Sequence, residues 1–181
     1  MILDPVITLT VALLLSYIFV TAALHKWQDR PQFIETLKNY RLLPERSLPL
    51  LLWFIPALEL ITGITLLLPR FAASAALCAL ALLGVYTLAI TINLLRGRRN
   101  IDCGCGSPDQ KQAISEWLLL RNGVLIFFAW LLLNPVADRA LFWFDWTVII
   151  PATVTACLFY NIVNRLLVNR GLLQTLRSQH G

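Results

Sequence analysis

The sequence predicts an all-α integral membrane protein: a bundle of four core transmembrane helices plus a fifth, with a short amphipathic surface helix after the first span. Of the 181 residues, 58% are hydrophobic and 14% are charged, whereas an ordinary soluble domain is about one-quarter charged. The mean hydropathy is +0.71. A chain of this length has room for one helical bundle, so we expect a single domain over residues 1–181.

Long apolar runs separated by short polar segments define the expected spans. They cover about residues 5–24, 48–68, 71–95, 117–133 and 146–168. The first run follows Asp4 and lacks the basic start of a secretory signal peptide, so we expect it to be a true span. The third is rich in alanine, which lets a neighbouring helix approach closely. Aromatic residues at 142–146 form a belt where the last span begins.

The segment between the first two spans has the pattern of a helix that lies on the membrane surface. Asp29 is placed to cap its start, and Pro31 falls in its first turn. Apolar residues then follow at helical spacing: Phe33, Ile34, Leu37 and Tyr40. Charged residues occupy the opposite face, which is typical of an interfacial helix. Pro44 is expected to end it.

Lys and Arg residues are distributed unevenly between the two sides that these spans define. Twelve of the 15 fall on one side, Arg121 lies inside a span, and only Arg70 and Arg139 fall on the other side. Because cytoplasmic loops are enriched in Lys and Arg, the N-terminus is predicted outside and the loop near residue 103 in the cytoplasm. The basic residues cluster at span ends, so we expect the lipid bilayer, and not nucleic acid, as a partner.

The polar loop between the third and fourth spans carries the strongest chemical signal, the sequence Cys103-Gly104-Cys105. Glycine lets the backbone fold tightly enough for the two sulfurs to meet. A thiolate can attack a partner's disulfide and the second cysteine can resolve the mixed disulfide, so the pair is a candidate redox centre. The basic residues of segment 96–99 favour the thiolate, whereas Asp102 opposes it.

Two other interpretations of Cys103 and Cys105 stay open. The first is a metal clamp, because two soft sulfurs suit copper(I) or zinc. Zinc needs two more ligands and the sequence offers no second cysteine pair, so no metal-ligating residues are assigned and the redox interpretation is preferred. In the second interpretation, the two thiols are structural residues of the loop and take part in no chemistry. Cys78 and Cys157 fall inside spans and are expected to be buried structural cysteines.

Glu59 and Arg121 are ionisable residues inside spans. Such residues are costly in a membrane and usually face the bundle interior and pair with one another, so we expect these two to pair and to lock the second span against the fourth. Proton movement, or binding of a quinone or a partner, is the alternative; no cofactor motif is evident. His25 and Lys26 lie on the cysteine side, where either can activate a thiolate, although a lysine that snorkels to the interface is the ordinary explanation.

Several separated motifs resemble the MauE family, which is related to the DoxX-like membrane proteins. The matching residues, in order, are His25-Lys26, Phe33, Tyr40–Pro44, Glu59-Leu60 with Gly63, Arg96-Gly97, Asp102–Cys105 and Arg121-Asn122. The resemblance covers about residues 5–133, and the last span matches only as a hydrophobic segment. Gly106-Ser107 stands where an aromatic residue often follows the Cys-Gly-Cys of the family.

The resemblance implies an accessory function in methylamine utilisation at a bacterial inner membrane. MauE-type proteins are associated with processing, transport or maturation of the disulfide-rich β-subunit of methylamine dehydrogenase, and a thioredoxin-like protein of the MauD type is the implied partner. We therefore expect thiol–disulfide exchange through Cys103 and Cys105 during maturation of an exported enzyme. A non-catalytic assembly or export factor and a metal-handling protein are the alternatives. The client lies outside the cytoplasm, whereas the charge bias predicts a cytoplasmic cysteine loop.

Overall fold

The computed structural model describes residues 2–42, 44–98, 101 and 114–179, and in this part of the chain every regular element is helical. The elements are α1 (Pro5–Gln28), α2 (Arg30–Tyr40), η1 (Glu45–Ser47), α3 (Leu48–Thr65), η2 (Pro69–Phe71), α4 (Ala72–Leu95), α5 (Glu116–Leu131) and α6 (Trp143–Gln179). The predicted all-α fold is confirmed.

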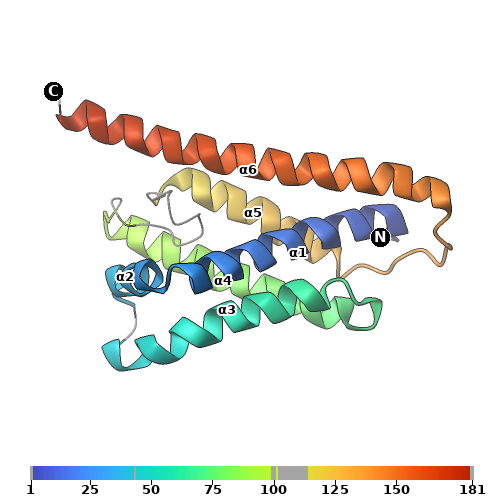
Figure 1. The fold of residues 1–181 in the computed structure, drawn as a ribbon, viewed down its shortest axis with the longest axis horizontal. Helices are drawn as coiled ribbons and strands as arrows, with labels where there is room; N and C mark the ends of the chain where they lie inside the picture. Colours follow the sequence, from blue (N-terminus) through green and yellow to red (C-terminus); the bar gives the residue numbers. More distant parts are fainter. Residues whose placement is uncertain (1, 43, 99–100, 102–113, 180–181) are drawn as a thin grey trace.

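Five of the α-helices run along the long axis of the molecule, and α2 crosses one end of it (Figure 1). Helix α1 is central because it packs against α3, α5 and α6, while α4 joins α3 to α5. The main core cluster draws most of its residues from α1, α4 and α5 and includes Leu15, Phe19, Ala76, Ala79 and Ala129. The alanines of α4 therefore allow the close helix approach that the sequence predicted.

Four segments are long and apolar enough to cross a membrane. They are α1, α3, the continuous segment Pro69–Leu95 and the first part of α6, Trp143–Asn169. The last predicted span is thus one of the four. Helix α5 has 16 residues and is about 24 Å long at 1.5 Å per residue, which is less than the hydrocarbon core of about 30 Å.

The capping residues explain where the first two helices begin and end. The side chain of Asp4 accepts a hydrogen bond from the Val6 N–H, and Asp29 accepts one from the Gln32 N–H, so each satisfies a free donor of a first turn. Helix α2 ends at Tyr40 because Arg41 takes a left-handed conformation with φ 49°. The helix therefore stops before Pro44, the predicted end.

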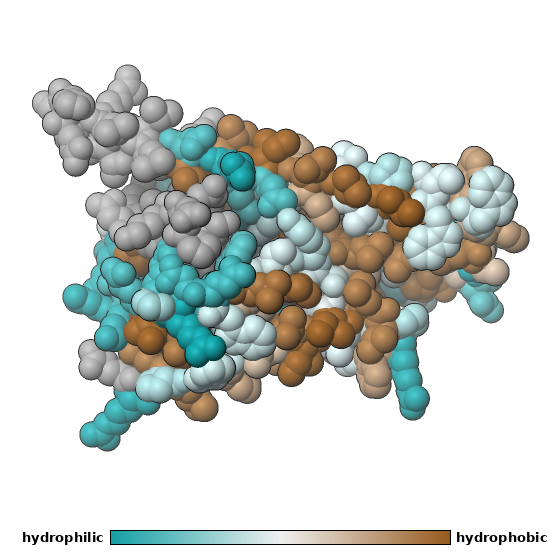
Figure 2. Space-filling model, in the orientation of Figure 1, coloured by the Kyte–Doolittle hydropathy of each residue, from teal (hydrophilic) through white to brown (hydrophobic). Residues whose placement is uncertain are grey.

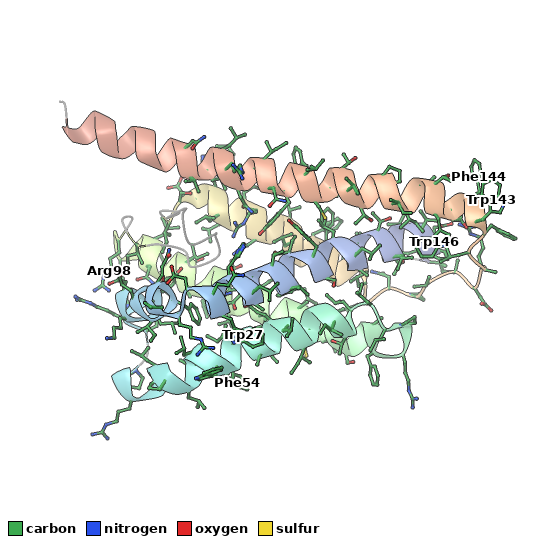
Figure 3. All side chains as sticks on the ribbon, viewed as in Figure 1. Trp27, Phe54, Arg98, Trp143, Phe144 and Trp146 are labelled. Atoms are coloured by element: carbon green, nitrogen blue, oxygen red, sulfur yellow. The ribbon has the colours of Figure 1, made fainter. Side chains whose placement is uncertain are left out.

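The two ends of the bundle differ in polarity. Helix α2, the end of α4, the start of α5 and the C-terminal part of α6 lie at one end (Figure 1), and hydrophilic residues gather on this end of the surface (Figure 2). Arg98 lies here, whereas the exposed aromatic residues Trp143, Phe144 and Trp146 lie at the other end (Figure 3). Aromatic residues of this kind are typical of the membrane–water interface.

At that aromatic end the N-terminus is tied to the segment between α5 and α6. The Leu3 N–H donates to the Pro135 carbonyl at 2.9 Å, and the Ala137 N–H donates to the Leu3 carbonyl at 2.8 Å. The Arg139 guanidinium donates to Asp4 at 3.1 Å. The backbone N–H of Val6 and then this guanidinium hold the pKa of Asp4 below its ordinary value.

Helices α1 and α3 lie close together at Gly63. A Cβ atom at this position would lie 2.9 Å from Val20 Cγ2 and 3.2 Å from the Ser16 carbonyl oxygen. The second atom belongs to the backbone of α1, which a side-chain rotation cannot move away. A residue larger than glycine would therefore push the two helices apart.

Gly63→Ala is accordingly expected to lower the free energy of unfolding by about 1–3 kcal/mol, the usual cost of overpacking. Gly84→Ala is the matched control, because a Cβ atom there meets nothing within 4 Å; the better helix propensity of alanine should stabilise it by up to about 1 kcal/mol. Denaturation of the detergent-solubilised protein, followed by circular dichroism, measures both. Equal effects of the two variants would contradict this packing.

Candidate functional site

A buried charged cluster joins α1, α3 and α4. Lys26 in the last turn of α1 donates from Nζ to Oε1 of Glu59 in α3 at 2.5 Å, and the Tyr86 hydroxyl of α4 donates to the same oxygen at 2.6 Å. Lys26 is 5% exposed and Glu59 is 1% exposed. We call these three residues the Lys26–Glu59–Tyr86 cluster. Each residue comes from a different helix, so the cluster forms only when the bundle has packed.

The antiparallel packing of α1 and α3 brings Lys26 to Glu59. Gly63 lies against Phe19 and Val20 of α1, and Glu59 is one helical turn earlier on the same side of α3. Because the helices are antiparallel, a step toward the N-terminus of α3 corresponds to a step toward the C-terminus of α1, where Lys26 lies in the last turn. The contact at Gly63 therefore sets the register that pairs the two charges.

The predicted pairing of Glu59 with Arg121 is wrong. Arg121 in α5 faces α6 instead: it donates to the Asn164 side-chain oxygen at 2.8 Å and to that of Asn122 at 3.2 Å, and its guanidinium lies 5.9 Å from the centre of the Tyr160 ring. Arg121 is 9% exposed. It therefore links α5 to α6, while Lys26 occupies the position next to Glu59.

The expectation that Lys26 snorkels to the interface is also wrong, because its ammonium group is buried. The Nζ atom lies 5.7 Å and 5.2 Å from the ring centres of Phe33 and Tyr86, in addition to its bond with Glu59. The neighbouring His25 is half-buried, and its carbonyl accepts the Asp29 N–H at the end of α1. Of the two residues on this side, the structure brings Lys26 into the charged cluster.

Tyr86 is the member of the cluster that was not predicted from the sequence. It stands in an alanine- and leucine-rich span, where an aromatic residue is easily taken for lipid contact. Its hydroxyl could have indicated a polar contact inside the bundle, because a tyrosine inside a membrane span needs a hydrogen-bond partner. Glu59 in the neighbouring span supplies that partner.

A cavity of about 230 Å³ adjoins the cluster, between α2, α3 and α4. Lys26 and Tyr86 form part of its wall, together with the aromatic residues Phe33 and Tyr40 of α2. The remainder of the lining is aliphatic apart from Thr36. The bundle thus holds an apolar space with a small number of polar groups on one wall, which is the usual composition of a small-molecule site.

Asp102, Cys103 and Cys105 lie outside the described residues, but the two ends of their loop are described. The Ile114 N–H donates to the Ile101 carbonyl at 3.0 Å, which joins the ends directly. Together with Leu118 and Ile90, these ends form a second apolar cluster, against which Tyr40 and Leu167 also pack. Ile101 and Ile114 are therefore held together at this end of the bundle.

Cys78 and Cys157 are both free thiols. Cys157 is half-buried and packs against the main core, but Cys78 is exposed on α4. The expectation that both are buried is therefore wrong for Cys78. They do not form a disulfide with each other.

The fold and the cluster define a multi-pass helical membrane protein with buried charged side chains and with the two ends of the cysteine loop joined at one end of the bundle. The model of the family described as methylamine utilisation protein MauE matches residues 4–135. The chain belongs to this family, as the motifs of the sequence indicated. The matched region contains the cluster, the cavity and the cysteine loop, and it ends before α6.

Relatives with the name methylamine utilization protein MauE occur in several bacteria. The chain is 36% identical to that of Paracoccus denitrificans over 127 residues, which are 70% of this chain and 68% of the relative. It is 41% identical to that of Paracoccus versutus over 126 residues, with 70% and 68% coverage. It is 38% identical to that of Methylorubrum extorquens over 141 residues, which are 76% of this chain and 75% of the relative. No solved structure matches.

Removing one partner of the buried pair should destabilise the bundle much more than removing both. Lys26→Met and Glu59→Gln each leave an uncompensated buried charge and are expected to cost about 3–5 kcal/mol of unfolding free energy. The double variant leaves no net charge and should recover most of that loss. Denaturation of the three purified variants in detergent measures the coupling between the residues.

Arg139→Gln is the control, because its partners Asp4 and Asp145 are at the exposed end of the molecule. Loss of this solvent-screened network should lower the free energy of unfolding far less than loss of either member of the buried pair. If the double variant instead loses the sum of the two single effects, Lys26 and Glu59 do not act as a pair.

Proposed function

We propose that this protein is a membrane accessory protein that exchanges thiols and disulfides through Cys103 and Cys105 during maturation of an exported enzyme. The observation that carries the proposal is the Cys-Gly-Cys sequence inside the matched family region, in a loop whose ends are joined at Ile101 and Ile114. The described ends of the loop, Ile101 and Ile114, lie at one end of the bundle, and the proposal assigns the exchange to that end. A partner protein can therefore dock there without entering the membrane.

The exchange proceeds through a mixed disulfide. The thiolate of one cysteine attacks the partner's disulfide, forms an S–S bond with one partner sulfur and releases the other as a thiolate. The second cysteine then attacks the mixed disulfide, which closes the Cys103–Cys105 bond and releases the partner as a dithiol. Two electrons pass from the loop to the partner. A disulfide closed across one residue is strained and easily reduced, so client thiols can drive the reverse reaction.

Basic residues near the loop ends favour the thiolate form. Arg96 and Arg98 follow directly after α4, and Arg121 lies one turn beyond Leu118, which packs against the loop ends. Positive charge near a cysteine lowers the pKa of its thiol and raises the thiolate fraction. Asp102, next to Cys103 in the sequence, acts in the opposite direction.

The name of the relatives supports methylamine utilisation as the setting of this exchange. In that setting the client is the disulfide-rich β-subunit of methylamine dehydrogenase, and a thioredoxin-like protein of the MauD type is the second exchange partner. The protein resides in the bacterial inner membrane with its N-terminus outside, and the basic residues at one end of the bundle support a cytoplasmic position for the loop. In this orientation the pair exchanges with cytoplasmic thiols, and the bundle relays the redox equivalents toward the exported client.

Cys103→Ser and Cys105→Ser should each lower client disulfide content and client activity by about tenfold or more, because each removes one step of the exchange. One single variant, which lacks the resolving cysteine, should accumulate a mixed disulfide that non-reducing electrophoresis detects. Cys78→Ser and Cys157→Ser are the matched controls and should behave as the wild type. A client with normal disulfides in both loop variants would show that the two cysteines are structural.

A second experiment addresses the side of the membrane. In the Cys78→Ser/Cys157→Ser background, a membrane-impermeant maleimide should fail to label Cys103 and Cys105 in intact spheroplasts and should label them after lysis. This result follows from the excess of Lys and Arg on the side of the loop. Labelling before lysis would reverse the orientation and place the exchange on the same side as the exported client.

A further inference from the structure

The cavity beside the Lys26–Glu59–Tyr86 cluster has the size of a ring-shaped small molecule. Its volume is about 230 Å³, and an engineered protein cavity of about 150 Å³ is large enough to hold benzene. Phe33, Tyr40 and Tyr86 contribute aromatic side chains to its wall. The space therefore has room for one substituted six-membered ring, with aromatic faces beside it.

Lys26 supplies hydrogen-bond donors at the wall of this cavity. An ammonium group has three N–H donors, and among the described residues the Nζ atom makes one hydrogen bond, to Glu59. A ligand that carries an acceptor oxygen can therefore bind to Lys26 without breaking the ion pair. An exclusively aliphatic ligand would leave these donors unsatisfied in an apolar space, which is unfavourable.

The charges of the cluster favour a neutral ligand. The positive charge of Lys26 is balanced by Glu59, which lies behind the wall and does not line the cavity. A ligand with a negative charge would add a second anion beside an ion pair that is already neutral, which is unfavourable. Oε2 of Glu59 has no hydrogen-bond partner among the described residues, and a buried polar atom in this state usually marks a site where a proton, a water molecule or a ligand completes the network.

The rim of the cavity lies on the exposed surface of α4. Val85 and Leu88 line the cavity on α4, and they are 62% and 61% exposed on a helix long and apolar enough to span the membrane. The rim therefore opens toward the hydrocarbon region, while α2 covers the cavity at the end of the bundle. A molecule that enters by this route must be soluble in the membrane.

We propose that this cavity binds a membrane-soluble quinone. A quinone is neutral and planar, carries carbonyl oxygens that accept hydrogen bonds from Lys26, and bears an apolar tail that can leave between Val85 and Leu88 into the lipid. The ring occupies the space beside Phe33, Tyr40 and Tyr86. This binding site goes beyond the proposed thiol exchange and does not depend on Cys103 or Cys105.

The test measures binding of a decyl-substituted benzoquinone to the full-length protein in lipid nanodiscs. Saturable quenching of tryptophan fluorescence is expected for the wild type and also for the Cys103→Ser/Cys105→Ser variant. Ala89→Phe fills the cavity and should weaken binding about tenfold or more, because the ring loses its space. Ala81→Phe is the matched control, since Ala81 is an exposed position on the same helix that does not line the cavity, and it should bind as the wild type.

A second pair of variants leaves the interior packing unchanged. Val85→Phe narrows the rim and should also weaken binding, whereas Leu77→Phe, at another exposed position of α4, should not. The proposal is overturned if the wild type does not bind the quinone saturably, or if Ala89→Phe and Ala81→Phe bind it alike. It is also overturned if an equal concentration of monoolein displaces the quinone, because the cavity would then be a site for neutral lipid. If the Cys103→Ser/Cys105→Ser variant still binds the quinone, the quinone site stands whether or not the thiol-exchange proposal holds.

Discussion

The ion pair between Lys26 and Glu59 is the constraint on which the rest of the bundle depends. Two charges in the interior of a membrane protein are tolerated only as partners, so α1 and α3 must keep the register that holds Nζ and Oε1 2.5 Å apart. Gly63 permits the close approach of the two helices, and Tyr86 extends the network to α4. The cavity between α2, α3 and α4 follows from the same arrangement, because Lys26 and Tyr86 form part of its wall.

The cavity and the two described ends of the cysteine loop lie at the same end of the bundle. Ile90 and Tyr40 belong to the wall of the cavity and also pack with the apolar cluster that holds the ends of the cysteine loop. Arg121, near the start of α5, connects this region to α6 through Asn164. Shared residues therefore connect the cavity to the ends of the loop by direct packing. Helix α6 contributes to this end although it lies beyond the region that matches the family.

Local signals in the sequence predicted most of the fold. Apolar runs, the capping residues Asp4 and Asp29 and the amphipathic pattern of α2 depend on neighbouring residues only, and the helices appear where these signals indicate. The partner of Glu59 could not be predicted in this way, because it depends on which helix packs against α3 and in what register. The exposure of Cys78 was missed for a related reason. A span that is apolar on every side does not reveal which face meets the lipid.

Thiol exchange is tested by measuring the oxidation state of Cys103 and Cys105 in living cells. Cells are quenched with acid, their thiols are alkylated differentially before and after reduction, and the peptide that carries Cys103 and Cys105 is analysed by mass spectrometry. An exchanging pair should be present both as a dithiol and as an internal disulfide, and the ratio should change when the client enzyme is expressed. A pair found in one state only, whether or not the client is expressed, would contradict the account.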